Sequence, residues 1–158
     1  MKLLIAVDME GISGVVNWEQ VKPGTSEWQR FRRIMTEDVN AAISGAMEAG
    51  VNEILVSDGH WNSDNIMIDL LDPRAKLNYG TPKPFSMIEG IDQGVDGLFL
   101  VGFHARAGTQ NAILDHTWSN IVVANVWLNE YLVGETGLNA ALAGHFDVPV
   151  LMISGDQT

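Results

Sequence analysis

Short, uninterrupted aliphatic runs recur along this chain, and they constrain its fold more than any other feature. The first is Leu3–Val7, and others lie at 53–57, 98–101 and 148–153. Runs of this length that end in polar residues or glycine are typical of strands buried on both faces of a parallel sheet.

The segments between these runs have the spacing of helices. Residues 26–49 carry apolar side chains at helical intervals, with Ser26 and Gln29 as a possible capping pair and Gly50 after the end. Shorter elements are expected at 64–71, 85–90 and 137–145 as helices, at 75–79 as a minor strand, and at 120–127 and 131–133 as a hairpin turning near Asn129. We therefore predict an α/β fold with a mostly parallel central sheet flanked by helices and a β-hairpin near 120–133. A chain of 158 residues is expected to form a single domain, 1–158.

Composition excludes several classes of function. Nine Lys and Arg against 20 Asp and Glu give a net charge of −11, which disfavours nucleic acids and anionic membranes as partners. The absence of cysteine excludes disulfides and thiolate metal sites. The first apolar run is interrupted at Asp8, too early for a signal peptide or a membrane span, so we expect a cytoplasmic protein.

Metal-ligand side chains follow the predicted strands where these end. They are Asp8 and Glu10 after the first run, His60 after the second, His104 after the third and Glu135 after the hairpin. Ligands of open α/β sheets bind beyond the carboxyl ends of the strands, so we expect these side chains to meet at one edge.

The mixture of imidazoles and carboxylates favours Zn²⁺, Mn²⁺ or Co²⁺ over Ca²⁺ and Mg²⁺, which prefer oxygen-only sites. Five ligands exceed the need of one tetrahedral ion and suit two neighbouring ions that share a carboxylate. Asp8 is the natural bridge because it lies deepest on the central strand. Taken singly, His60 and His104 are more often structural, hydrogen-bonded residues than ligands, and Glu135 is compatible with capping a helix. Their convergence at one edge of the sheet favours the metal site.

Other polar residues keep two interpretations. Asp58 is expected to cap a turn. His116 lies in a loop, where an imidazole either moves protons near neutral pH or is merely solvated. His145 ends a helix and is expected to be structural. Arg106 and Lys83 are candidates for binding a substrate carboxylate, although surface ion pairing is the preferred interpretation for Lys83. A Walker lysine and a Gly-x-Ser-x-Gly elbow are both missing from the sequence.

With these residues in place, the chain resembles the zinc-dependent D-aminopeptidases of the DppA type. The matching stretches follow in order along nearly the whole chain: Val7–Gly14, Val56–His60, Lys83–Met87, Gly102–Ala107, Val133–Ala140 and Asp147–Met152.

The resemblance implies two zinc ions, one held by Asp8, Glu10 and His60 and the other by Asp8, His104 and Glu135. It places His116 where the family has its catalytic histidine. It further implies a ring-shaped homo-oligomer, a decamer, and short peptide substrates with an N-terminal D-residue, D-Ala-D-Ala among them. Family chains continue beyond this length, and we expect that C-terminal continuation to be absent from residues 1–158.

Three other functions remain open from the sequence. The same ligand types serve dinuclear amidases and phosphoesterases. A non-catalytic dipeptide-binding component of an uptake system would use the cleft without turnover. A structural metal site would bury its ions with no open coordination position.

Overall fold

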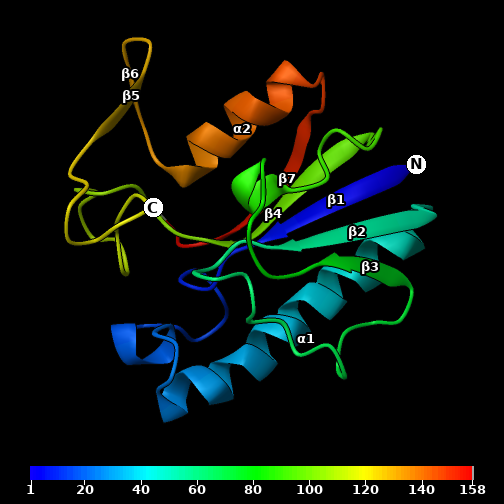
Figure 1. Ribbon diagram of the computed structural model, residues 1–158, viewed down its shortest axis with the longest axis horizontal. Helices are drawn as coiled ribbons and strands as arrows, with labels where there is room; N and C mark the ends of the chain where they lie inside the picture. Colours follow the sequence, from blue (N-terminus) through cyan, green and yellow to red (C-terminus); the bar gives the residue numbers. More distant parts are fainter. Residues whose placement is uncertain (158) are drawn as a thin grey trace.

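A computed structural model describes residues 1–157 and places a parallel sheet between helices that cover its two faces (Figure 1). The strands of this sheet run in the spatial order β3-β2-β1-β4-β7, with β1 at Lys2–Val7, β2 at Glu53–Asp58, β3 at Ala75–Asn78, β4 at Gly97–Phe103 and β7 at Val150–Gly155. The helices are α1 (Ser26–Glu48) and α2 (Glu135–His145), with short 3-10 turns η1 (Trp18–Gln20) and η2 (Ser86–Ile88). Strands β5 (Val126–Leu128) and β6 (Tyr131–Val133) form a separate antiparallel hairpin. The predicted α/β class, parallel sheet and hairpin are confirmed.

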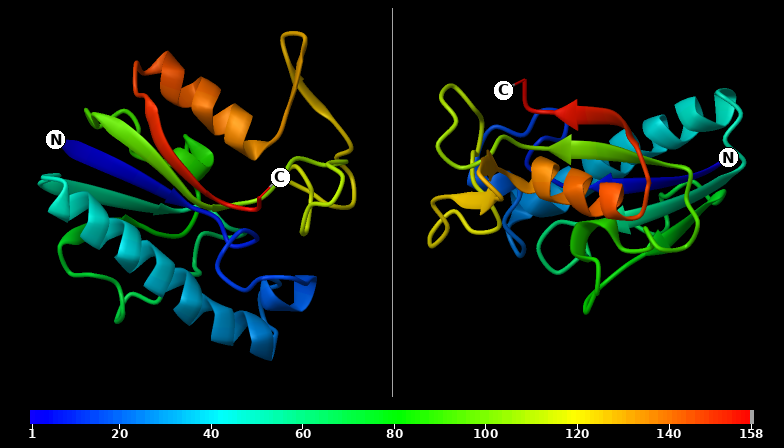
Figure 2. Two further views of the ribbon diagram at one scale, coloured as in Figure 1. Left: turned by 180° about the vertical axis from the view of Figure 1, so that it is seen from behind. Right: turned by 90° about the horizontal axis from the view of Figure 1, so that it is seen from above.

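Strand β1 is central because its side chains are apolar on both faces. Leu3, Ile5 and Val7 pack into the core on the α1 side, whereas Leu4 and Ala6 pack into the core that includes η2 and residues of α2. All five side chains are fully buried. The two views in Figure 2 show α1 and α2 on opposite faces of the sheet. The continuous aliphatic run thus places β1 in the middle of the molecule.

Helix α1 has the predicted length, but its cap lies one residue earlier than expected. The side chain of Thr25, rather than that of Ser26, accepts the backbone N–H of Trp28. The helix lays a stripe of apolar side chains on the sheet, among them Phe31, Met35 and Val39. Burial of this stripe, at about 25 cal/mol per Å² of apolar surface, fixes the helix to the sheet.

The register of the central strands aligns their carboxyl ends. Val7 of β1 pairs with Asp58 of β2 on one side and with Val101 of β4 on the other. Residues that follow these three strands must therefore emerge at the same edge of the sheet. This is the geometric condition that the sequence-based prediction of a metal site required.

The predicted helix at 64–71 is wrong. Its backbone groups are occupied by distant partners: the N–H groups of Asn65 and Ile66 donate to the Asp58 carboxylate, and Arg32 donates to the carbonyls of Asp64 and Asn65. The N–H groups would be free at the start of any helix, but the Asp64 and Asn65 carbonyls would have to begin its hydrogen-bond ladder. Because Arg32 binds both carbonyls, the segment forms bends and turns instead.

The predicted strand at 120–127 is shortened for a similar reason. The hydroxyl of Ser119 accepts the N–H groups of Ile121 and Val122, and this contact favours a turn over an extended strand. Strand pairing begins only at Val126. The hairpin stands away from the body beyond the carboxyl ends of the sheet, as Figures 1 and 2 show. Within residues 1–157, neither helix combines the length and apolarity needed to cross a membrane.

Candidate metal centre

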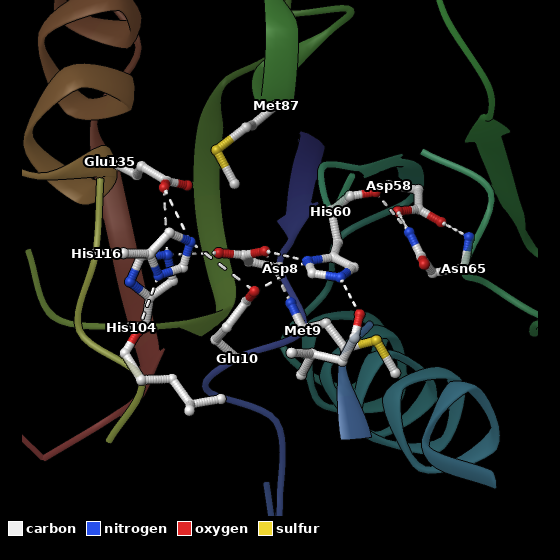
Figure 3. A network of polar contacts seen from close by, with 12 residues as sticks. Asp8, Met9, Glu10, Asp58, His60, Asn65, Met87, His104, His116 and Glu135 are labelled. Carbon is white, nitrogen blue, oxygen red and sulfur yellow. Dashed lines mark hydrogen bonds and ion pairs between the residues drawn. The ribbon is translucent and has the colours of Figure 1, made fainter. Parts of the chain in front are cut away.

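The five predicted ligand residues meet at the carboxyl edge of the sheet (Figure 3). They form two sets that share one carboxylate: Asp8 with Glu10 and His60, and Asp8 with His104 and Glu135. Within each set, one ligand atom per residue lies within 4.8 Å of the others, and all are buried. The geometry thus brings together the same two sets that the family resemblance implies.

Asp8 lies between the two sets and faces each with a different oxygen. Its Oδ1 is 3.3 Å from Nδ1 of His60, and its Oδ2 is 3.3 Å from Nε2 of His104. Glu10 Oε2 lies 3.0 Å from the same His60 nitrogen, and Glu135 Oε1 lies 3.3 Å from the same His104 nitrogen. This arrangement suits a carboxylate that serves two cations.

Each imidazole of the cluster turns one nitrogen inward and anchors the other on a backbone carbonyl. His60 Nε2 lies 2.7 Å from the Val21 carbonyl, and His104 Nδ1 lies 2.9 Å from that of Ala105. His116 Nδ1 lies 2.9 Å from the carbonyl of Leu114. A carbonyl only accepts, so each outer nitrogen carries a proton. The inner nitrogen of the neutral ring then offers its lone pair to the centre.

Several atoms at the centre are buried without a hydrogen-bond partner among the described residues. They include Asp8 Oδ2, Glu10 Oε2 and His104 Nε2. Orphaned buried polar atoms are costly, and one cation in each of the two sets would satisfy them. Two imidazole nitrogens with three carboxylates are also the donor types that Zn²⁺ accepts, so the residues fit that ion.

The pKa shifts in the metal-free chain show that the cluster favours positive charge among its carboxylates. Burial alone would raise the pKa of Asp8, but contacts with His104 and His60 hold it well below its usual value. Burial alone would lower the pKa of His104, but Asp8 and Glu135 raise it to about 11. The pKa of His60 is likewise raised well above its usual value, against burial, by Glu10 and Asp8. Burial and the charge of Asp8 raise the pKa of Glu10. In the metal-free chain, protons on His60 and His104 thus supply the positive charge that bound cations would supply.

His116 belongs to this cluster and is not a solvated loop residue. It is 8% exposed, and its ring stacks on that of His104 with centroids 3.8 Å apart and an interplanar angle of 10°. Its Nε2 lies 3.9 Å from Glu10 Oε1 and 3.8 Å from Glu135 Oε1. The rings of Trp18 and His116 make a T-shaped contact, with their centroids 5.3 Å apart. His116 therefore faces both sets from one side.

Glycine allows the strand exits to approach this closely. Gly102 has a φ of +75°, and a Cβ there would lie 2.3 Å from the carbonyl oxygen of Asp8. At Gly59, a Cβ would lie 2.8 Å from the carbonyl oxygen of Val7. Both separations are too short for any side chain, so these positions bring His104 and His60 against the end of β1.

The remaining polar residues have mixed outcomes. Asp58 caps a turn, as predicted, by accepting the N–H groups of Asn65 and Ile66. His145 lies in the last turn of α2, as predicted. Surface ion pairing is wrong for Lys83, because its half-buried amine donates to Ser57 Oγ and to the carbonyls of Asp58 and Asn78. Burial lowers the pKa of Lys83. Arg106 donates to the Ala107 carbonyl, and its binding of a substrate carboxylate stays a prediction.

Sequence reasoning missed the backbone contacts that orient the ligands. The N–H of Trp118 donates to Glu135 Oε1 over 2.7 Å, and the Met9 N–H donates to Asp8 Oδ1 over 2.9 Å. Backbone donors carry no residue-specific signal, so no motif could have revealed them.

A cavity of about 500 Å³ opens directly onto the cluster. Asp8, Glu10, His60, His116 and Glu135 line its floor, and its walls include three tryptophans, Trp18, Trp61 and Trp118, together with Met87 and Ile121. A cavity that combines apolar walls with convergent polar groups is a usual form of a small-molecule site. Its size suits a short peptide.

Comparison with known proteins agrees with this geometry. The model of the Peptidase_M55 family, described as D-aminopeptidase, matches residues 1–158. The chain belongs to this family. It is 45% identical over 157 residues to the D-aminopeptidase of Bacillus subtilis (strain 168), covering 99% of this chain. A solved structure, described as the Zn-dependent D-aminopeptidase DppA from Bacillus subtilis, a self-compartmentalizing protease, superposes with a TM-score of 0.95 at 44% identity over 99% of this chain.

The match covers only part of each D-aminopeptidase relative. The chain spans 57% of the length of the curated relative and 57% of the solved chain. The shared part contains the whole cluster described above, because the match extends over nearly all of the present chain.

Proposed function

We propose that this chain carries the dinuclear zinc centre of a D-aminopeptidase that hydrolyses short peptides with an N-terminal D-residue, of the D-Ala-D-Ala type. One observation carries the proposal. Two buried three-residue sets share Asp8 at the floor of a cavity, in a chain that belongs to a D-aminopeptidase family.

In this proposal Asp8, Glu10 and His60 hold one zinc ion, and Asp8, His104 and Glu135 hold the other. When bound, zinc supplies Lewis-acid polarisation of a carbonyl and lowers the pKa of a coordinated water towards about 7. The donor set also accepts Mn²⁺ or Co²⁺. The solved relative is described as Zn-dependent, which supports zinc as the resident ion.

His116 is proposed to handle the proton of the reaction. Its Nδ1–H is fixed on the Leu114 carbonyl, so Nε2 is the nitrogen turned towards the cavity side of the cluster. Peptide hydrolysis needs a proton delivered to the leaving amine nitrogen, and a positioned imidazole supplies or receives such a proton near neutral pH. The stacked His104 ring and the edge of Trp18 restrict His116 to this orientation.

The cavity favours a small peptide with a free amine. Carboxylates at the floor attract the substrate ammonium group, and the tryptophans offer apolar contacts to its side chains. No Lys or Arg is among the described residues that line the cavity, so any cationic partner for the substrate carboxylate lies outside them.

A panel of substrates tests the proposal. The zinc-loaded protein is expected to hydrolyse D-Ala-D-Ala and other peptides with an N-terminal D-residue. The matched L-peptides are expected to be poor substrates, and N-acetylated D-peptides should not react because they lack the free amine. Preferential turnover of phosphoesters would instead indicate a dinuclear phosphoesterase. Dipeptide binding without turnover by metal-replete protein would indicate a binding component.

We also propose self-association into a ring-shaped homo-oligomer, a decamer by family resemblance. The relative is described as a self-compartmentalizing protease, which supports assembly. Large apolar side chains of the hairpin region are exposed, with Ile121 at 87%, Tyr131 at 76% and Trp127 at 59%. Exposed apolar surface of this kind commonly marks a protein interface. The cytoplasmic location stays a prediction from the sequence.

A further inference from the structure

The loop that carries His60 has an uncommon backbone. Trp61 has a φ of 51° and Ser63 a φ of 59°, both in the left-handed region that residues other than glycine rarely adopt. Such conformations persist where the surrounding contacts fix them, and they cluster at functional sites. The contacts that fix this loop should therefore also determine where His60 lies.

Asn65 supplies the central contacts of the loop. It is fully buried, and its side-chain Nδ2 donates to the His60 carbonyl over 2.6 Å and to Asp58 Oδ1 over 2.9 Å. Its backbone N–H donates to Asp58 Oδ2 over 2.6 Å. Figure 3 shows Asn65 and Asp58 behind His60, on the side away from His104. One amide thus joins the main chain of His60 to the end of β2.

The other side of Asn65 is held by helix α1. Trp28 Nε1 donates to Asn65 Oδ1 over 2.9 Å, and Arg32 Nε donates to the Asn65 carbonyl over 2.8 Å. Every polar atom of the Asn65 side chain therefore has a partner, two for the donor nitrogen and one for the acceptor oxygen. Only a side chain with both an acceptor and two donors on one short stem can make this set of contacts.

We propose that Asn65 is a positioning residue for His60 and that it sets the zinc affinity of the Asp8–Glu10–His60 position. The inference rests on the proposed function, because it assumes that this position binds zinc. His60 is the one ligand of the three that comes from this loop, since Asp8 and Glu10 follow β1. The second position takes its ligands from the ends of β1 and β4 and from α2, so a change at Asn65 should affect it less than the first.

The test is Asn65→Leu, which keeps the branched shape of the side chain and removes every side-chain hydrogen bond. Both zinc dissociation constants are measured by competition with a chromophoric chelator. We expect one constant to weaken by about 10- to 100-fold, the usual effect of losing a partner that orients a metal ligand. The other constant should weaken by a smaller factor, because Asn65 contacts none of its three ligands and the two positions share only Asp8.

Thr36→Val is the matched control. Thr36 lies in α1 and is fully buried, like Asn65. Its hydroxyl accepts a hydrogen bond from the N–H of Met67, two residues beyond Asn65. The substitution removes a helix-to-loop hydrogen bond without touching His60. It is expected to lower the melting temperature and leave both zinc constants unchanged, which separates positioning from general destabilisation.

A double variant with His60→Ala shows whether Asn65 acts through His60. If it does, Asn65→Leu does not weaken the Asp8–Glu10–His60 position any further in that background, because the ligand that Asn65 orients is already gone. Should Asn65→Leu fail to fold, Asp58→Asn replaces it. This variant keeps the volume but places a donor against Asn65 Nδ2 or against the backbone N–H groups, and it should weaken the same constant.

Equal constants in wild type and folded Asn65→Leu, or equal weakening at both positions, would overturn the inference. In the same titration, a wild-type protein that binds no zinc would overturn the proposed function itself. The wild-type stoichiometry therefore distinguishes the two failures.

Discussion

Substitution of Asp8 by alanine tests the shared carboxylate most directly. Asp8 places Oδ1 near His60 and Oδ2 near His104, each at 3.3 Å from the ring nitrogen. A residue that served one ion would need only one of these contacts. Asp8→Ala therefore removes a ligand from both sets at once and leaves each with two.

The magnitude follows from ligand linkage. An ion present at about 1,000 times its dissociation constant stabilises the folded state by about 4 kcal/mol. Two ions then contribute about 8 kcal/mol, and a protein of this size gains roughly 2–4 °C of melting temperature per kcal/mol. The wild-type protein should melt roughly 16–32 °C higher with zinc than with chelator. We expect Asp8→Ala to lose most of this difference, together with its hydrolytic activity.

The assay is thermal unfolding with zinc and with chelator, combined with elemental analysis of the isolated protein. Asp92→Ala is the control, because Asp92 is an exposed aspartate outside the cluster. It should retain both ions and the full zinc-dependent stabilisation. Two ions retained per chain in Asp8→Ala, with the same zinc-dependent change in melting temperature, would refute the bridging role.

Three further predictions concern proton transfer, pH and assembly. His116→Ala should retain both ions but lower the turnover number by roughly 10²–10⁴, as measured with a D-dipeptide; unchanged turnover would reduce His116 to a spectator. The pKa of His104 is raised to about 11 in the folded metal-free protein, so the protonated ring contributes its full stabilisation below about pH 6.5. This contribution is lost as the pH rises through about 11. Chemical denaturation with chelator should show this loss, and a flat profile would contradict it. Trp127→Asp, on the exposed hairpin, should shift the protein to smaller species in sedimentation velocity with the zinc content unchanged, whereas an unaltered assembly would place the interface elsewhere.

The sheet could be predicted because its signal is local and strong. A run such as Leu3–Val7 has one favourable environment, between two apolar layers, and the structure places it there. The segment 64–71 has a helical pattern that is equally local, but side chains from elsewhere compete for its backbone groups. Arg32 and Asp58 hold those groups, and a pattern read along the chain contains no record of such distant donors and acceptors.

The convergence of the cluster could be predicted for a related reason. Parallel strands end at one edge, so residues that directly follow them are neighbours whatever their separation in sequence. His116 follows no sheet strand, and its stacking on His104 depends on how the loop folds back over the edge. Its burial was therefore beyond prediction from position alone, although the family resemblance indicated its importance.

The carbonyl anchors of the three imidazoles have a consequence for evolution. Val21, Ala105 and Leu114 contribute main-chain oxygens, which every amino acid possesses. A substitution that the surrounding packing accommodates, and that leaves the local path of the chain intact, deprives no histidine of its partner. A comparison of sequences would therefore carry no sign of the three main-chain oxygens that keep the rings in place.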